Sequence, residues 1–366
     1  MQRRGSLLVG AGGTVLALLL TACTAAGPRA ADLAEPSPSA SAPASSPDEP
    51  SASASAEPET PPAEPEATPT LRPRPVSLPA LFEKDYNGGG LRIGRTLLET
   101  ATYTEHYVTY RSGDLRISGI LNVPRGRGPH PAVVLAHGYI DPAYYVNGQG
   151  LTRERGWLAD AGFVTLHTDY RNHAGSSDAP RTELTMRLGY TEDVVNAVLA
   201  LRRTDQVRVD DDRIGLLGRS MGGGVVYNTL AAQPGLVDAG VAFAPVSSRA
   251  ADNFNTFTRR DDDPGDDDTA TAILRRYGEP RDNPGFWRGV SPRTYFDRVT
   301  EPVLIHHGSS DDTCPIRWSR ATTRALEDAG ADVRMRTYPG EEHAFGPQFA
   351  LSMRRTVAFF RAHLRA

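Results

Sequence analysis

The chain contains the pentad GRSMG at residues 218–222, which fits the pattern G-x-S-x-G. Before it, the apolar run 214–217 predicts a short buried strand, and after it the small, apolar segment 223–232 predicts a helix. A serine on a sharp strand-to-helix turn has a strained backbone, and glycines on either side allow the chain to approach closely. The sequence therefore predicts that the hydroxyl of Ser220 projects from the end of a strand as a nucleophile. The pentad alone is as compatible with an idle serine in a glycine-lined turn, so the remaining segments must supply the context.

Strand-like and helix-like segments alternate along most of the chain after residue 102. The first two strands flank the turn at residues 112–114 and predict a hairpin. The later alternation predicts a mostly parallel central sheet with helices on both faces, and places reactive residues on loops at the carboxyl ends of its strands. The predicted strands are 103–111, 115–123, 131–138, 163–168, 214–217, 239–243, 303–306 and 333–338, and the predicted helices are 155–161, 192–202, 223–232, 322–329 and 351–364.

One segment, at about 247–298, interrupts this alternation. It contains the acidic runs 261–263 and 266–268 among several aromatic residues. We expect a helical cap insertion that partly covers the site. The acidic runs lack the D-x-D-x-D-G spacing of a calcium loop, so a solvated loop is favoured, with weak calcium binding as the alternative.

The first 22 residues have the pattern of a signal peptide, with Arg3 and Arg4 before an apolar stretch at 7–20. The end of this stretch, Leu-Thr-Ala-Cys at 20–23, resembles the lipobox of bacterial lipoproteins, which implies lipidation of Cys23. The expected location is therefore extracytoplasmic, anchored by lipid to a bacterial membrane. An ordinary secretory signal would instead release the protein.

The segment 23–78 consists almost entirely of Pro, Ala, Ser, Thr and Glu, which bury too little apolar surface to fold. It predicts a disordered linker that holds one globular domain, 79–366, away from the anchor. Only Cys23 and Cys314 are present, so no internal disulfide is expected once Cys23 is acylated. The net charge of -4 gives no electrostatic reason to expect a nucleic-acid partner.

A serine nucleophile requires a base, and that base requires a carboxylate to orient it. Two loops that follow predicted strands supply candidates: 307–315 contains Asp311 and Asp312, and 339–345 contains His343. The chain order Ser, Asp, His agrees with one known arrangement of these three groups. Adjacent carboxylates cannot be separated without geometry, so Asp312 remains an alternative to Asp311.

The motifs together resemble an α/β-hydrolase, and most closely the catalytic domain of the prolyl oligopeptidase family. The matching segments cover most of 103–364. They include H-G at 137–138, the pentad at 218–222, H-G-x-x-D-x-x-V-P at 307–315 with cysteine in place of valine, and Y-P-G-x-x-H-x-F at 338–345.

The resemblance implies an α/β-hydrolase fold and a role for each site residue. Ser220 would be the nucleophile, His343 the general base and Asp311 the acid that orients it. The backbone N–H groups of Tyr139 and Met221 would form the oxyanion hole. No metal, cofactor or protein partner is implied, and the expected substrate is a small-molecule ester or a peptide.

Two departures from the family leave the substrate open between ester and peptide. Peptidases of the family carry a β-propeller before the hydrolase domain, where this chain has the proline-rich segment. The segment 169–176, DYRNHAGS, also resembles a loop of esterases. In it we expect Asp169 to fix the loop and His173 to be structural, and we expect His137 to brace the oxyanion loop. A carboxylesterase and a non-catalytic tethered binding module are the alternatives.

Overall fold

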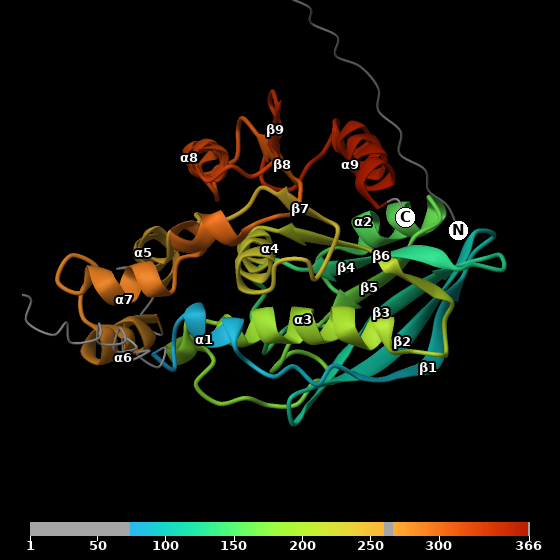
Figure 1. Ribbon diagram of the computed structural model, residues 1–366, viewed down its shortest axis with the longest axis horizontal. Coiled ribbons are helices and arrows are strands. Elements are labelled where there is room, and N and C mark those ends of the chain that lie inside the picture. The colour runs from blue at the N-terminus through green and yellow to red at the C-terminus, as the bar shows by residue number, and fades with distance from the viewer. Residues whose placement is uncertain (1–73, 260–265, 365–366) are drawn as a thin grey trace, which may run out of the picture. The chain divides into compact units, whose positions relative to one another are not determined.

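A nine-stranded sheet organises the computed structural model, which describes residues 74–259 and 266–364 (Figure 1). Its strands lie in the order β1-β2-β3-β5-β4-β6-β7-β8-β9. The strands are β1 (Gly89–Glu99), β2 (Tyr103–Ser112), β3 (Leu115–Pro124), β4 (His130–Ala136), β5 (Val164–Thr168), β6 (Val209–Arg219), β7 (Ala239–Phe243), β8 (Val303–Gly308) and β9 (Val333–Tyr338).

The sheet has an antiparallel part and a larger parallel part. Strands β1, β2, β3 and β5 pair antiparallel, whereas β5, β4, β6, β7, β8 and β9 pair parallel. The predicted hairpin is β2–β3, in which Ser112 pairs with Leu115. The prediction of a mostly parallel sheet is confirmed, because β4 and β6–β9 all end at the same edge.

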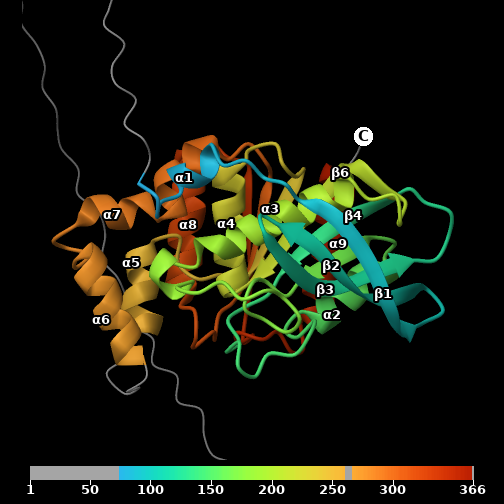
Figure 2. The same ribbon diagram turned by 90° about the horizontal axis from the view of Figure 1, so that it is seen from below.

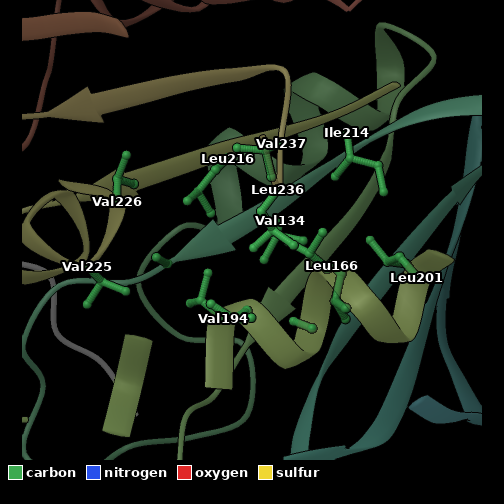
Figure 3. Close-up of a cluster of buried hydrophobic side chains, with 14 of the residues drawn as sticks. Val134, Leu166, Val194, Leu201, Ile214, Leu216, Val225, Val226, Leu236 and Val237 are labelled. Atoms are coloured by element: carbon green, nitrogen blue, oxygen red, sulfur yellow. The ribbon is translucent and has the colours of Figure 1, made fainter. Parts of the chain in front are cut away.

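Helices cover both faces of the sheet, as Figures 1 and 2 show. Alternate residues of β4 face opposite sides, so Val134 packs in one apolar cluster while Val133 and Leu135 pack in another. Figure 3 shows part of the first cluster, to which Val134 of β4 and Val194 of α3 both belong. Burying one such side chain stabilises the fold by about 1.5–3 kcal/mol. The helices on the first face are α3 (Leu188–Arg202), α4 (Met221–Ala232) and α8 (Ile316–Asp328), and those on the second are α2 (Thr152–Asp160) and α9 (Phe349–His363).

The insertion between β7 and β8 is helical where the structure describes it. The acidic run 261–263 lies outside the described residues. Within the described ranges, no group of His, Cys, Asp and Glu side chains is arranged to hold a metal ion. The elements are α5 (Ala250–Asn253), a π-helical turn (Phe254–Thr258), α6 (Asp266–Tyr277), α7 (Pro284–Gly289) and a 3-10 segment (Pro292–Arg298).

The folded domain begins before residue 79, where the sequence places its start. Leu78 is fully buried in an apolar cluster with Trp287, and its N–H donates to the carbonyl of Gly289 at 2.8 Å. The short helix α1 (Pro79–Phe82) follows directly. The composition of the linker hides this boundary, because few apolar residues near its end, Val76 and Leu78, pack against this cluster.

Strand β1 is a further element that the alternation did not predict. Most of its side chains are exposed, so it lacks the apolar periodicity of a buried strand. The signal peptide, Cys23 and most of the linker lie outside the described residues. Within those residues, no helix has the length and apolar character required to cross a membrane.

Candidate active site

Ser220 occupies a strained turn between β6 and α4. Its backbone has φ 57° and ψ -121°, a region that non-glycine residues rarely adopt. The N–H of Ser220 donates to the carbonyl of Phe243 at 3.0 Å, and its carbonyl accepts from Val246 at 3.1 Å. These bonds to the end of β7 and to the loop after it hold the turn at the carboxyl edge of the sheet.

The glycines of the pentad are required by space. A Cβ at Gly222 would lie 1.9 Å from the carbonyl oxygen of Ala136, and a Cβ at Gly218 would lie 2.2 Å from the carbonyl oxygen of Gly222. Both contacts are with backbone atoms, which cannot move aside as a flexible side chain would. The pentad therefore has the spatial requirement that the sequence predicts for it.

Arg219, inside the pentad, ties this turn to helix α2. Its guanidinium forms an ion pair with Glu154 at 3.0 Å and also donates to the carbonyl of Gly150. The side chain of Glu154 is almost fully buried, so the pair is shielded from solvent. Sequence reasoning assigned no role to Arg219, because neither partner lies near it in the chain.

Asp311 lies against His343. The Nδ1 of His343 is 2.9 Å from Oδ2 and 3.1 Å from Oδ1 of Asp311. The carboxylate side chain is fully buried, whereas 23% of the imidazole is exposed. Asp312 is exposed and accepts instead from the hydroxyl of Thr313 at 3.2 Å. Of the two adjacent carboxylates, the structure thus brings Asp311 to the histidine.

Hydrogen bonds keep the Asp311 carboxylate ionised despite its burial. Burial raises its pKa, but the side chains of His307 and His343 and the N–H of Cys314 outweigh that effect and hold the pKa below its ordinary value. The N–H of Cys314 donates to Oδ1 at 2.8 Å, and that of Thr313 at 3.0 Å. The carboxylate is therefore fixed in place as an anion.

His307 is a site residue to which sequence reasoning gave no role. Its Nε2 lies 2.8 Å from the carbonyl oxygen of Cys314 and 3.2 Å from Asp311, and its Nδ1 lies 2.7 Å from the hydroxyl of Ser319. It closes the loop 308–314 around the carboxylate. The signal was available, because histidine opens the motif H-G-x-x-D, but its function depends on contacts within the loop.

The thiol of Cys314 lies close to the hydroxyl of Ser220. Burial raises the pKa of this thiol to about 12, an effect that the nearby Asp311 reinforces and the hydrogen bond with Ser220 opposes. Among the described residues, no hydrogen bond joins Ser220 to His343. Catalytic hydrogen bonds are often long without substrate and tighten when it binds. Because its pKa is raised and its side chain is fully buried, Cys314 lies beside the nucleophile as a protonated thiol.

The two residues expected to form the oxyanion hole flank the serine. Met221 follows Ser220 and begins α4, where the first N–H groups of a helix lack intrahelical acceptors. Tyr139 follows Gly138, and a Cβ on Gly138 would lie 3.1 Å from the Cβ of Ser220. The loop after β4 thus passes directly beside the nucleophile.

His137 and His173 make structural contacts, as the sequence predicts. The ring of His137 lies between carbonyl oxygens of Gly138 at 2.6 Å and Asp169 at 3.3 Å. Burial, with the neighbouring His173, lowers its pKa to about 3, so the ring is neutral. His173 lies within hydrogen-bonding distance of the carbonyls of Arg171 and Ile140. Neither histidine is placed as a base for Ser220.

A profile of the prolyl oligopeptidase family matches residues 150–366. The chain belongs to this family. As a member of the prolyl oligopeptidase family it is a serine hydrolase of the peptidase or esterase type. Pig dipeptidyl peptidase 4 is 30% identical over 190 residues, which are 51% of this chain and 23% of that protein. The chain thus spans about a quarter of the length of the dipeptidyl peptidases it matches.

Solved structures similar to this family member share its α/β-hydrolase fold. Acetyl xylan esterase 1 from Thermoanaerobacterium superposes with a TM-score of 0.53 at 18% identity, covering 74% of this chain and 88% of the esterase. Acylaminoacyl peptidase from Pyrococcus horikoshii gives 0.55 at 22% identity, covering 71% of this chain and 40% of the peptidase. The fold that the sequence predicts is therefore confirmed.

Proposed function

We propose that this serine hydrolase cleaves carboxylic esters through an acyl-enzyme, with Ser220, His343 and Asp311 as its catalytic triad. The observation that carries the proposal is the buried Asp311 carboxylate held 2.9 Å from Nδ1 of His343, at the sheet edge where Ser220 follows β6. A carboxylate at Nδ1 selects the tautomer whose Nε2 is free to accept a proton.

In the first step, Nε2 of His343 takes the proton of the Ser220 hydroxyl as its oxygen attacks the acyl carbon. Asp311 stabilises the resulting imidazolium, because its pKa is held low enough for it to remain an anion. The N–H groups of Tyr139 and Met221 donate to the oxyanion of the tetrahedral intermediate. Donors fixed before the reaction stabilise this charge without having to reorganise.

In the second half, the imidazolium gives its proton to the leaving alcohol or amine, which departs and leaves Ser220 acylated. Water then enters, gives a proton to His343 and attacks the acyl carbon, and the same oxyanion contacts form again. The Ser220 oxygen takes the proton back as the acid leaves. The exposed part of the His343 ring faces solvent, from which this water can come.

Esters are the first substrate class because two observations favour them. The segment 169–176 resembles a loop of esterases, and the acetyl xylan esterases match this fold over 88% and 92% of their own length. Peptide bonds are the second candidate, since the proteins similar in sequence include dipeptidyl peptidases and acylamino-acid-releasing enzymes. Cleavage of either bond proceeds through an acyl-enzyme on Ser220.

For its location, we propose acylation of Cys23 after removal of residues 1–22, with the hydrolase domain outside the cytoplasm on its proline-rich linker. The apolar run 7–20 followed by Leu-Thr-Ala-Cys supports this proposal. Labelling cells with an alkyne fatty acid tests it: Cys23→Ser should lose the label, and equal labelling of both proteins would refute the anchor.

The catalytic proposal is tested by steady-state kinetics on p-nitrophenyl acetate and on an aminoacyl p-nitroanilide. We expect hydrolysis of the ester, and loss of at least about 10⁴-fold in kcat for Ser220→Ala and His343→Ala. A fluorophosphonate probe should label the wild type and not Ser220→Ala. Full activity in Ser220→Ala would disprove the triad, and faster turnover of the anilide would replace ester by amide as the preferred bond.

A further inference from the structure

Arg187 contacts the side chains of both residues proposed for the oxyanion hole. Its Nη1 lies 3.8 Å from the sulfur of Met221, and its guanidinium carbon lies 4.7 Å from the centre of the Tyr139 ring. Tyr139 comes from the loop after β4 and Met221 from the start of α4, so these residues lie far apart in the chain. A single side chain thus bridges the two halves of the proposed hole.

Glu183 fixes the guanidinium in this position. Nε of Arg187 lies 2.9 Å from one carboxylate oxygen and 2.6 Å from the other, and both side chains are more than half shielded from solvent. The carboxylate neutralises much of the positive charge of the guanidinium. Arg187 therefore acts on its neighbours mainly through the contacts of its planar group and less through its electrostatic field.

The backbone also holds Arg187 in an uncommon conformation. Met186 and Arg187 have φ of 55° and 54°, two successive left-handed residues without glycine, directly before α3 starts at Leu188. The N–H of Arg187 donates to the carbonyl of Thr182 at 3.0 Å. Strain of this kind persists only where the surroundings fix the conformation, and it gathers at functional sites.

We infer that Arg187, held by Glu183, is a positioning residue that aligns the backbone N–H groups of Tyr139 and Met221 toward the oxyanion. This inference rests on the proposed function and adds a residue to it. Tyr139 is 54% exposed. Stacking of its ring on a fixed guanidinium restrains the ring and the backbone next to it. The role requires the planar group, so lysine should not replace it.

The test compares two substrates that differ in the atom entering the hole: p-nitrophenyl acetate and its thionoacetate, in which sulfur replaces the carbonyl oxygen. Aligned N–H donors favour oxygen over sulfur. We expect Arg187→Ala to lower kcat on the oxygen ester about 30-fold, with KM changed less than about threefold, since small misplacements in an active site cost up to about 10²-fold. The oxygen-to-sulfur rate ratio should fall about fivefold or more.

Matched variants separate positioning from folding and from charge. Arg187→Lys should resemble Arg187→Ala, and Glu183→Gln should lie between Arg187→Ala and the wild type, because glutamine still accepts a hydrogen bond from Nε. Arg181→Ala is the control: Arg181 is exposed, lies in the same segment and also has a positive φ of 67°. It should match the wild type. Rates are normalised to sites titrated with a fluorophosphonate.

The outcomes distinguish this inference from the proposed function. If the wild type hydrolyses the ester and Ser220→Ala does not, an unchanged rate or an unchanged oxygen-to-sulfur ratio in Arg187→Ala overturns the inference alone. Rescue by Arg187→Lys would show that charge acts, and would also overturn it. If the wild type hydrolyses neither ester, the proposed function fails and this inference fails with it.

Discussion

Two aspartates with fully buried side chains follow strands of the same sheet, yet their surroundings differ. Asp169, after β5, is surrounded by donors that hold its two oxygens in a closed arrangement. Asp311, after β8, is held by the loop on one side and faces His343 on the other. The donors to Asp169 are the hydroxyls of Ser118 (2.5 Å) and Tyr145 (2.8 Å), the amide of Asn147 (2.6 Å) and the N–H of Gly148 (2.9 Å).

The difference shows what separates a structural acid from one suited to catalysis. Burial and hydrogen bonding are common to both aspartates. Only Asp311 has a titratable partner that is itself partly exposed to solvent, and therefore to a substrate. Asp169 instead stabilises the loop 145–148, which agrees with the loop-fixing role predicted for it. A sequence motif alone does not distinguish the two environments.

The largest effect is expected when Asp311 is replaced, and it should appear in kcat. Asp311→Asn should lower kcat by roughly 10³–10⁴-fold, because an amide holds the imidazole in the wrong tautomer. Asp312→Asn, whose side chain is exposed, is the matched control and should retain kcat within about threefold. Ester kinetics on both variants measure this contrast. A larger loss of kcat in Asp312→Asn than in Asp311→Asn would show that Asp312 is the acid of the triad.

Replacing Asp169 should lower the stability of the fold. Asp169→Asn places an amide NH₂ among four donors, so we expect the free energy of unfolding to fall by about 2–4 kcal/mol. Urea unfolding monitored by tryptophan fluorescence measures it. Asp311→Asn should lose less stability than Asp169→Asn while losing more kcat. A larger loss of stability in Asp311→Asn, or a larger loss of kcat in Asp169→Asn, would contradict the comparison.

Two buried histidines, His137 and His306, predict an acid-sensitive fold. Burial, with the charge of His173 or Arg355 respectively, lowers the pKa of His137 and of His306 to about 3. The unfolded chain binds these protons near pH 6.5, so stability is full above that pH and is lost as the pH falls toward 3. The loss should be about 1 kcal/mol per pH unit for each imidazole.

Urea unfolding at pH 7.5, 6.0 and 5.0 gives the slope of stability with pH. His306→Gln should reduce that slope by about one proton, even if the variant is less stable at every pH. An unchanged slope in His306→Gln would show that His306 does not titrate as its burial requires.

The smallest effect concerns Cys314, which tests how closed the Asp311 loop is. With a pKa of about 12, roughly one thiol in 10⁴ is ionised at pH 8, so iodoacetamide should barely modify the native protein. A Cys23→Ser background leaves Cys314 as the one reporter, and labelling in urea is the positive control. Labelling at the rate of a free thiol in the native state would show that the loop opens.

Much of the fold could be predicted because the parallel strands are short, continuous apolar runs separated by helical segments. Strand β1 could not, since its side chains are mostly exposed and its place depends on pairing with β2. The end of the linker could not either, because Leu78 is recognisable as a core residue only from its contact with the segment around Trp287. Both features depend on contacts with other segments of the chain, which the local sequence pattern does not reveal.

The sequence by itself determined the parts that short-range geometry dictates. The pentad at 218–222 needs glycines within a few residues of Ser220, and the loops of Asp311 and His343 follow their strands directly. Only the tertiary structure decided which of two adjacent carboxylates meets the imidazole, and that Arg187 joins Tyr139 to Met221. Such choices depend on the direction of a side chain and on segments that approach only in the folded chain.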